Sequence, residues 1–282
     1  MLTSAQLSTF HTNGYLILES VVPSSVVDRL QEEGNQLLKN LSEKDGTNWK
    51  QVLQSRGCIV EPLQSCFDDS ITTEAVTNKQ KYRELRALVS SGASEILDFI
   101  LGDLMKSMES LLCTSSRKVY LLNEQFIMKH PSPKDTKFEY HQDREYFAHQ
   151  NVPYVSCWTA LDDMSEDNGC LYIVPYPKKL AKNGGFGSPQ EWIEHHEMQA
   201  SFYKSKEHYQ QNQEDNIDDH KEIPILVPKG SLVILACTVL HRSGSNLSGK
   251  IRRAFMPQYS TDIIYGENGK PVGWGIPLQA AS

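Results

Sequence analysis

The stretch that decides the fold is residues 229–260, KGSLVILACTVLHRSGSNLSGKIRRAFMPQYS. It opens with a Lys-Gly turn and continues through residues 232–240, an almost continuous apolar run that is rich in branched side chains. A short apolar run between turn residues favours a buried β-strand over a helix. We therefore predict a strand that ends at His241, where a Ser-Gly-Ser-Asn loop follows and a β-barrel would open.

A second strand is predicted from Ile251 to Ser260, and an arginine lies near its start. Side chains alternate between the two faces of a strand. The face of Arg252 also carries Ala254, Met256 and Gln258, and the opposite face carries Arg253, Phe255 and Tyr259. A guanidinium that points into a barrel is costly unless it meets an anion, and its planar fork suits a carboxylate. We expect this inward role for Arg252 and a surface ion pair for Arg253.

One residue separates His141 from Asp143, and His241 follows a hundred residues later. On a strand, His141 and Asp143 point to the same face, because the side-chain period is two. Together with the imidazole of His241 they would bind a metal from one side. Two histidines with one carboxylate are the ligands of non-haem Fe(II) oxygenases. Two alternatives stay open: the His-x-Asp pair can be a solvated turn, and His241 can be a hydrogen-bonded core histidine.

Four segments carry a family resemblance. In chain order they are residues 2–18, the His141-Gln-Asp143 motif, residues 158–163 with 167–175, and the stretch from His241 to Arg252. These segments resemble the phytanoyl-CoA dioxygenase family of Fe(II)- and 2-oxoglutarate-dependent oxygenases, and together they span most of residues 1–260. The resemblance implies an enzyme that uses Fe(II), with 2-oxoglutarate and O2 as co-substrates.

The resemblance also implies roles for individual residues. The metal ligands would be His141, Asp143 and His241. The co-substrate residues would be Arg252 and Ser243 at the distal carboxylate of 2-oxoglutarate, Gln125 and Trp158 along its pocket, and Lys81 as the candidate for an assisting lysine. The substrate would meet residues that follow the iron motif and one later aromatic, namely Arg144, Tyr146, Phe147, His149 and Trp192.

The implied function is oxidation of a C–H bond in a small to medium metabolite, by hydroxylation or by desaturation or cyclisation, with release of succinate and CO2. A metabolite with a carboxylate that Arg144 or His149 could meet is favoured. One alternative is an acyl-CoA 2-hydroxylase of the phytanoyl-CoA type. Others are a cupin-like isomerase or thiol dioxygenase that needs no 2-oxoglutarate, and a metal-binding module without this chemistry.

The pattern along the chain is helical first and then mostly β. We predict helices over residues 3–13, over 24–41 with Ser24 or Ser25 as the cap, and over 81–110, and an early strand over 15–18. Later strands are predicted over 118–129, 136–147, 153–162, 169–174, 222–227, 231–240 and 251–260. This order is typical of a mainly β fold with flanking helices, a jelly-roll or cupin-like double-stranded β-helix barrel.

We interpret residues 1–282 as one domain. It would consist of helical support over 1–117, a jelly-roll core over 118–260 and a tail over 261–282. The core contains a polar insertion over 177–221, and a loop of that length inside a compact domain is typically functional or disordered. It is either a lid over the barrel mouth or a solvated insertion. Its adjacent pair, His195 and His196, diverges on a helix or strand and is a poor metal site.

Composition excludes several classes of protein. The net charge of −7 and the lack of a basic stripe argue against a nucleic-acid partner. The six cysteines contain no Cys-x-x-Cys pair, and several lie in apolar runs, which is typical of free thiols. We see no signal peptide, no membrane span and no carboxyl-terminal Ser-Lys-Leu signal, so we expect a cytoplasmic protein that acts on a small molecule. The oligomeric state stays open.

Overall fold

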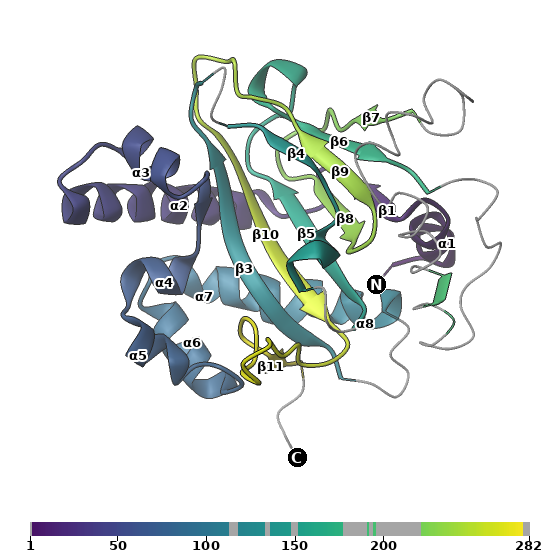
Figure 1. Ribbon diagram of the computed structural model, residues 1–282, viewed down its shortest axis with the longest axis horizontal. Coiled ribbons are helices and arrows are strands. Elements are labelled where there is room, and N and C mark those ends of the chain that lie inside the picture. Colours follow the sequence, from purple (N-terminus) through teal and green to yellow (C-terminus); the bar gives the residue numbers. More distant parts are fainter. Residues whose placement is uncertain are drawn as a thin grey trace.

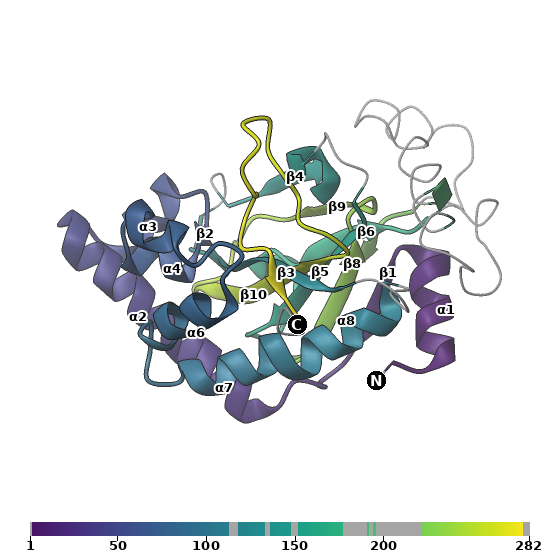
Figure 2. The same cartoon turned by 90° about the horizontal axis from the view of Figure 1, so that it is seen from below.

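The structure is a computed structural model that describes residues 2–112, 118–132, 136–147, 152–176, 191, 194–195 and 221–278. Its described part has three layers, which Figures 1 and 2 show from two directions. Helices cover one face of a seven-stranded antiparallel sheet, and a four-stranded antiparallel sheet lies on the other side. In the described residues the two sheets remain separate and do not join into a closed barrel.

The seven-stranded sheet has the order β1-β8-β5-β10-β3-β11, with β2 paired to β3. Its strands are β1 (Tyr15–Leu18), β8 (Leu232–Ala236), β5 (Tyr154–Ala160), β10 (Arg252–Ser260), β3 (Tyr120–Lys129), β11 (Ile276–Pro277) and β2 (Ile59–Val60). The four-stranded sheet has the order β4-β9-β6-β7. Its strands are β4 (Phe138–His141), β9 (Leu240–Ser243), β6 (Leu171–Val174) and β7 (Ile223–Pro224).

The helices precede the large strands in the sequence, as predicted. They are α1 (Ser4–Asn13), α2 (Ser24–Asp45), α3 (Trp49–Ser55), α4 (Pro62–Cys66), α5 (Asp69–Thr73), α6 (Lys79–Ala87), α7 (Ala93–Asp98), the π-helical turn η1 (Phe99–Leu104) and α8 (Met105–Leu111). A capping box between Thr3 and Gln6 starts α1, and Gly14 ends it at φ 79°, a left-handed conformation that favours glycine. None of the described helices is both long and apolar enough to cross a membrane.

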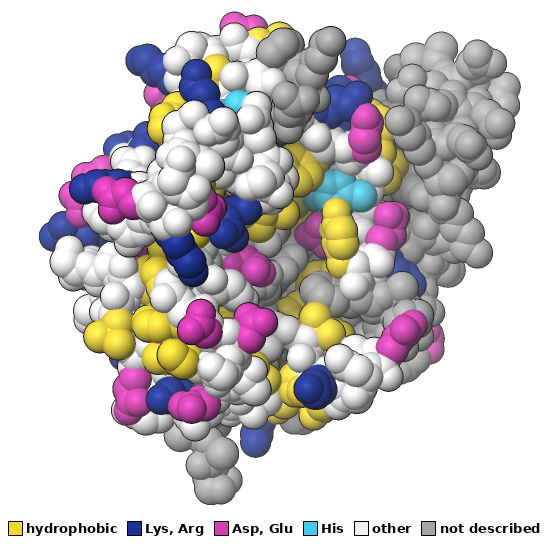
Figure 3. Space-filling model, turned by 60° about the vertical axis from the view of Figure 1, so that its left-hand side comes forward, with side chains coloured by type: hydrophobic (Ala, Val, Ile, Leu, Met, Phe, Trp, Pro, Cys, Tyr) yellow, Lys and Arg dark blue, Asp and Glu magenta, His cyan; other side chains and the backbone are white. Residues whose placement is uncertain are grey.

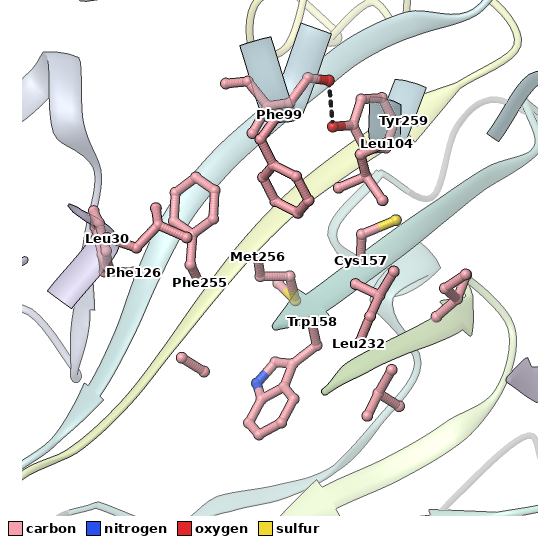
Figure 4. Close-up of a cluster of buried hydrophobic side chains, with 14 of the residues drawn as sticks. Leu30, Phe99, Leu104, Phe126, Cys157, Trp158, Leu232, Phe255, Met256 and Tyr259 are labelled. Atoms are coloured by element: carbon pink, nitrogen blue, oxygen red, sulfur yellow. Dashed lines mark hydrogen bonds between the residues drawn. The ribbon is translucent and has the colours of Figure 1, made fainter. Parts of the chain in front are cut away.

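The core lies between the helices and the outer face of the seven-stranded sheet. Figure 4 shows Phe99 packed near Phe255 and Tyr259, whose side chains leave β10 on its helix side. The hydroxyl of Tyr259 donates a hydrogen bond to the carbonyl of Ile100 at 2.7 Å, which fixes η1 on the sheet. Met256, which follows Phe255 on β10, points to the opposite face of the sheet, as the predicted alternation requires.

A buried ion cluster also holds the helices to the sheet. The guanidinium of Arg86 on α6 donates hydrogen bonds of 2.8 Å to Glu33 on α2 and to Glu124 on β3. Tyr82 donates to the same Glu124 carboxylate at 2.6 Å. Burial lowers the pKa of Arg86, but the two carboxylates outweigh it, so the net direction is upward. Because each buried charge has an oppositely charged partner, removal of one partner would leave the other uncompensated.

Several boundaries differ from those predicted. The single strand predicted over 231–240 is wrong, because β8 ends at Ala236 and β9 begins at Leu240 in the other sheet. Both strands are buried, so the hydrophobic pattern does not reveal the turn between them. The predicted helix over 81–110 is divided into α6, α7, η1 and α8, and α2 begins after Pro23 without a side-chain cap from Ser24 or Ser25.

Candidate active site

A cavity of ≈ 270 Å³ lies between the two sheets. Figure 3 shows the hollowed face of the molecule, where a histidine lies among hydrophobic and acidic side chains. The residues that line the cavity are Ile59, Asn123, Gln125, Ile127, Phe138, His141, Asp143, Tyr146, Trp158, Leu171, Leu235, His241, Ser243, Arg252, Met256 and Gln258. Both sheets contribute to this set, so the cavity exists only when they pack against each other.

The predicted metal ligands converge on this cavity. The Nε2 atoms of His141 and His241 lie 3.8 and 3.6 Å from the same carboxylate oxygen, Oδ1 of Asp143. All three candidate ligand atoms lie within 4.8 Å of one another. The two histidines face each other directly across the β4–β9 pair. Asp143 reaches them differently from the prediction, because β4 ends at His141 and Asp143 begins a 3-10 turn, η2 (Asp143–Phe147).

Backbone carbonyls orient both imidazoles. Nδ1 of His141 lies 2.7 Å from the carbonyl oxygen of Glu139, and Nδ1 of His241 lies 3.0 Å from that of Val239. A carbonyl can only accept, so each Nδ1 carries the proton and each Nε2 presents a lone pair to the cavity. Burial lowers the pKa of His241, with an opposing effect from Asp143, and so favours the neutral imidazole that a metal requires.

Asp143 is held by a hydrogen-bonded chain from the seven-stranded sheet. Gln258 donates through Nε2 to the hydroxyl of Ser156 at 2.9 Å, and that hydroxyl donates to Oδ2 of Asp143. Ser156 and Gln258 are direct partners on β5 and β10. Since Oδ2 is engaged, Oδ1 is the oxygen that faces the two imidazoles. This arrangement favours a carboxylate that binds a metal through one oxygen and leaves other positions open.

Arg252 points into the site as predicted, and most of its hydrogen-bonding capacity is unused. The guanidinium is buried, and its Nη2 donates to the carbonyl of Gly169 at 2.8 Å. Its Nε and Nη1, and Nε1 of Trp158, have no hydrogen-bond partner among the residues that the structure describes. Burial lowers the pKa of Arg252 to about 10. Buried donors without partners are costly, so this set fits a bound anion such as a carboxylate.

Lys129 is a second buried basic residue, which lies beside Arg252 and Ser243 without itself lining the cavity. It is the direct cross-strand partner of Arg252, and its Nζ donates to Oγ of Ser243 at 2.7 Å and to the carbonyl of Gly244 at 2.5 Å. Burial, and then the charge of Arg252, lower the pKa of Lys129 to about 6. Since Ser243 accepts from Lys129, its own hydroxyl proton is available to a ligand.

Only some of the other predicted site residues line the cavity. Gln125, Trp158, Ser243 and Tyr146 line the cavity. Lys81 does not, because it lies on α6 and pairs with Glu74 at 2.8 Å. Arg144 does not line it either. His149, Trp192, the side chain of Phe147 and nearly all of the predicted lid over 177–221 lie outside the described residues.

Sequence reasoning missed Lys129 and Ser156 and gave no role in the site to Gln258. The alternation along β3 held a signal, because the polar residues Asn123, Gln125 and Lys129 share one face of the strand. The pairing of β3 with β10 brings Lys129 to Arg252, and this register cannot be read from either strand alone. The prediction for Arg253 is confirmed, because it forms an ion pair with Asp162 at 2.7 Å.

Comparison with known proteins agrees with this geometry. Residues 10–254 match the phytanoyl-CoA dioxygenase (PhyH) family. The peroxisomal phytanoyl-CoA dioxygenase of Homo sapiens is 22% identical over 270 residues, which cover 94% of this chain and 70% of that protein. The phytanoyl-CoA dioxygenase of Arabidopsis thaliana is 23% identical over 278 residues, which cover 95% of this chain and 91% of that protein.

Solved structures share the fold at lower identity. The α-ketoglutarate-dependent carbocyclase SnoK from nogalamycin biosynthesis aligns with a TM-score of 0.55 and 15% identity, over 99% of this chain and 94% of that one. EctD from S. alaskensis, solved with 2-oxoglutarate and 5-hydroxyectoine, aligns with a TM-score of 0.53 and 16% identity, over 100% and 85%. The chain therefore belongs to the phytanoyl-CoA dioxygenase family, and it is a non-haem dioxygenase that depends on Fe(II) and 2-oxoglutarate.

Proposed function

We propose that this enzyme oxidises a C–H bond of a small to medium metabolite, by hydroxylation or by desaturation or cyclisation. The observation that carries the proposal is the convergence of His141, Asp143 and His241 beside the unpaired donors of Arg252. Fe(II) and 2-oxoglutarate would supply the oxidising chemistry, with succinate and CO2 as co-products. The protein would supply the metal ligands, orient 2-oxoglutarate and the metabolite, and exclude water from the site.

The residues divide into two groups along the cavity. His141, Asp143 and His241 would hold Fe(II) from one side, which leaves positions for 2-oxoglutarate and O2. Arg252, Lys129 and Ser243 would bind the distal carboxylate of 2-oxoglutarate. Gln125 and Trp158 would line the co-substrate pocket between these groups, and Trp158 offers a buried N–H without a described partner. Charge-assisted hydrogen bonds to a carboxylate are stronger than neutral ones. This supports binding of the distal carboxylate beside Arg252, with the keto-acid end toward the metal ligands.

The same proposal extends to the architecture. We infer that the two facing sheets correspond to a double-stranded β-helix, or jelly roll, within one domain that spans the chain. The support is the cavity itself, since residues from both sheets surround it. The helices of residues 1–112 pack on the seven-stranded sheet and would act as its support rather than as a separate unit.

An acyl-CoA 2-hydroxylase is the second candidate. It is favoured by the names of the curated relatives, which are phytanoyl-CoA dioxygenases. In this case phytanoyl-CoA would accelerate succinate formation, whereas in the first case an unrelated metabolite would do so.

The test is succinate release by the purified enzyme. We expect slow release that requires Fe(II), 2-oxoglutarate and O2 together, and faster release when a substrate is added. Asp143→Ala should abolish it, because removal of a ligand destroys the metal site. Asp103→Ala, which changes an exposed carboxylate on η1, is the matched control and should retain it. Succinate release by Asp143→Ala at the wild-type rate would contradict the proposal.

A further inference from the structure

Tyr146 lies against two of the three candidate metal ligands. It belongs to η2, the 3-10 turn that begins at Asp143. Side chains three positions apart eclipse in a 3-10 helix, so Tyr146 leaves the turn on the same side as Asp143. The ring of Tyr146 also meets the imidazole of His141 edge-on, with 5.9 Å between the two ring centroids. Both relationships bring the phenol to the metal end of the cavity, which it lines.

Besides Tyr146 and the histidines, two aromatic rings line the described part of the cavity, and both lie beside its basic residues. The ring centroid of Trp158 lies 5.7 Å from the guanidinium carbon of Arg252. The ring centroid of Phe138 lies 5.1 Å from Nζ of Lys129. These two rings therefore lie where we place the distal carboxylate of 2-oxoglutarate, whereas the ring of Tyr146 lies beside the metal ligands.

The ring of Tyr146 is not fixed by packing. Tyr146 is 67% exposed, whereas Trp158 is 1% exposed. Exposed side chains change rotamer in roughly picoseconds to nanoseconds, and enzymes turn over about 1–1000 times per second. Tyr146 therefore samples its orientations many times within one turnover, including those that bring its ring edge toward the metal position. Trp158 has no such freedom.

We propose that Tyr146 is a modification site: in the absence of substrate, the enzyme hydroxylates the phenol ring of Tyr146 to a catechol. This inference goes beyond the proposed function and rests on it. The reacting carbon of a substrate must approach the open side of the metal, because the three ligands hold the metal from the other side. Tyr146 lines that side of the cavity, so a bound substrate would exclude its ring and an empty cavity would admit it.

The modification needs no reagent beyond those that the enzyme already uses. Decarboxylation of 2-oxoglutarate releases CO2 and leaves one oxygen atom of O2 in succinate. The other oxygen atom enters a ring carbon next to the phenol hydroxyl, where the ring is rich in electrons. That C–H bond breaks, a C–O bond forms, and the hydrogen is carried by the new hydroxyl group. Since 2-oxoglutarate and the ring each lose two electrons, O2 is fully reduced and no further reductant is required.

The test is peptide mapping of the substrate-free enzyme by mass spectrometry. The protein is incubated with Fe(II), 2-oxoglutarate and air, and succinate is measured in the same sample. We expect the peptide that contains Tyr146 to gain the mass of one oxygen atom. A boronate resin should retain that peptide, because boronates bind catechols and not phenols. Tyr265, a second exposed tyrosine, should remain unmodified and controls for oxidation by Fe(II) free in solution.

Two further samples connect the modification to the site. N-oxalylglycine has the carboxylates of 2-oxoglutarate but does not undergo decarboxylation, so Tyr146 should gain no oxygen when this analogue replaces the co-substrate. Asp143→Ala removes a candidate metal ligand and should likewise leave Tyr146 unmodified.

The outcomes separate this inference from the proposed function. Succinate formation with an unmodified Tyr146 overturns the inference and leaves the proposed function standing. Equal oxygen uptake by Tyr146 and Tyr265, or oxygen uptake by Tyr146 in the presence of N-oxalylglycine, overturns the inference as well. Absence of succinate from the wild-type sample overturns both.

Discussion

Lys129 on β3 and Arg252 on β10 are direct cross-strand partners, and both side chains are buried. Two positive charges in this position would destabilise a sheet, and burial would add to the cost, so burial and the charge of Arg252 lower the pKa of Lys129 to about 6. Beside this lysine, two guanidinium nitrogens of Arg252 have no described hydrogen-bond partner. An anion at this position would offset both effects, so we propose that the pair is a preformed site for the distal carboxylate of 2-oxoglutarate.

The first prediction concerns Lys129 itself. Lys129→Met should lower the affinity for 2-oxoglutarate by about 10- to 100-fold, the range expected for loss of a charged hydrogen-bonding group. The affinity for Co(II) should stay the same, because Lys129 contacts no metal ligand in the structure. Calorimetric titration of metal-loaded protein measures both. Lys250→Met changes a surface lysine and serves as the control; an equal loss in both variants would contradict the assignment.

A second prediction follows from the pKa of Lys129, which burial lowers to about 6. Below pH 6 the ammonium is already charged when 2-oxoglutarate arrives. Above pH 6 the lysine is neutral, and a bound carboxylate raises its pKa, so binding must take up a proton. The affinity for 2-oxoglutarate should therefore fall as pH rises above 6, by up to about tenfold per pH unit.

Proton uptake can be measured directly by titration in two buffers with different ionisation enthalpies. The wild-type enzyme should take up a proton on binding 2-oxoglutarate at pH 8, and Lys129→Met should lack that proton. The idea is wrong if both proteins show the same uptake, because the titrating group would then be another residue.

The third prediction concerns the chain from Gln258 through Ser156 to Asp143. Ser156→Ala should weaken metal binding by about 10- to 100-fold, as loss of a residue that orients a metal ligand does. Ser156→Thr keeps the hydroxyl and should recover most of the affinity. The visible spectrum of the Co(II) protein should also change in Ser156→Ala, because Oδ2 of Asp143 becomes free to bind. Unchanged affinity and spectrum would show that the hydroxyl does not position Asp143.

The fourth prediction concerns stability. Tyr259→Phe removes the hydroxyl that donates a hydrogen bond to the carbonyl of Ile100. The free energy of unfolding should fall by about 0.5–1.5 kcal/mol, the usual contribution of one hydrogen bond. Denaturant titration measures it, and affinity for Co(II) and 2-oxoglutarate should be retained, since Tyr259 faces the helices rather than the cavity. A loss of ligand affinity without a loss of stability would contradict this separation.

The sequence predicted what depends on residue type and local order. Alternation along β10 placed Arg252 inside and Phe255 outside correctly, because a side-chain period of two needs no tertiary information. The spacing of His141 and Asp143 predicted that both lie at the site, but it also predicted a continuous strand between them, and that is wrong. A 3-10 turn, and not a continuous strand, brings Asp143 to the histidines.

By itself, the sequence determined the kind of site: two imidazoles, a carboxylate and an inward guanidinium, in a chain whose hydrophobic pattern is mainly β. Only the tertiary structure decided which residues surround them. It brought Lys129 opposite Arg252 and Ser156 to Asp143, and it placed Lys81 on a helix away from the cavity. The physical reason is that strand register and sheet packing join residues that are distant in sequence, and no local pattern encodes those distances.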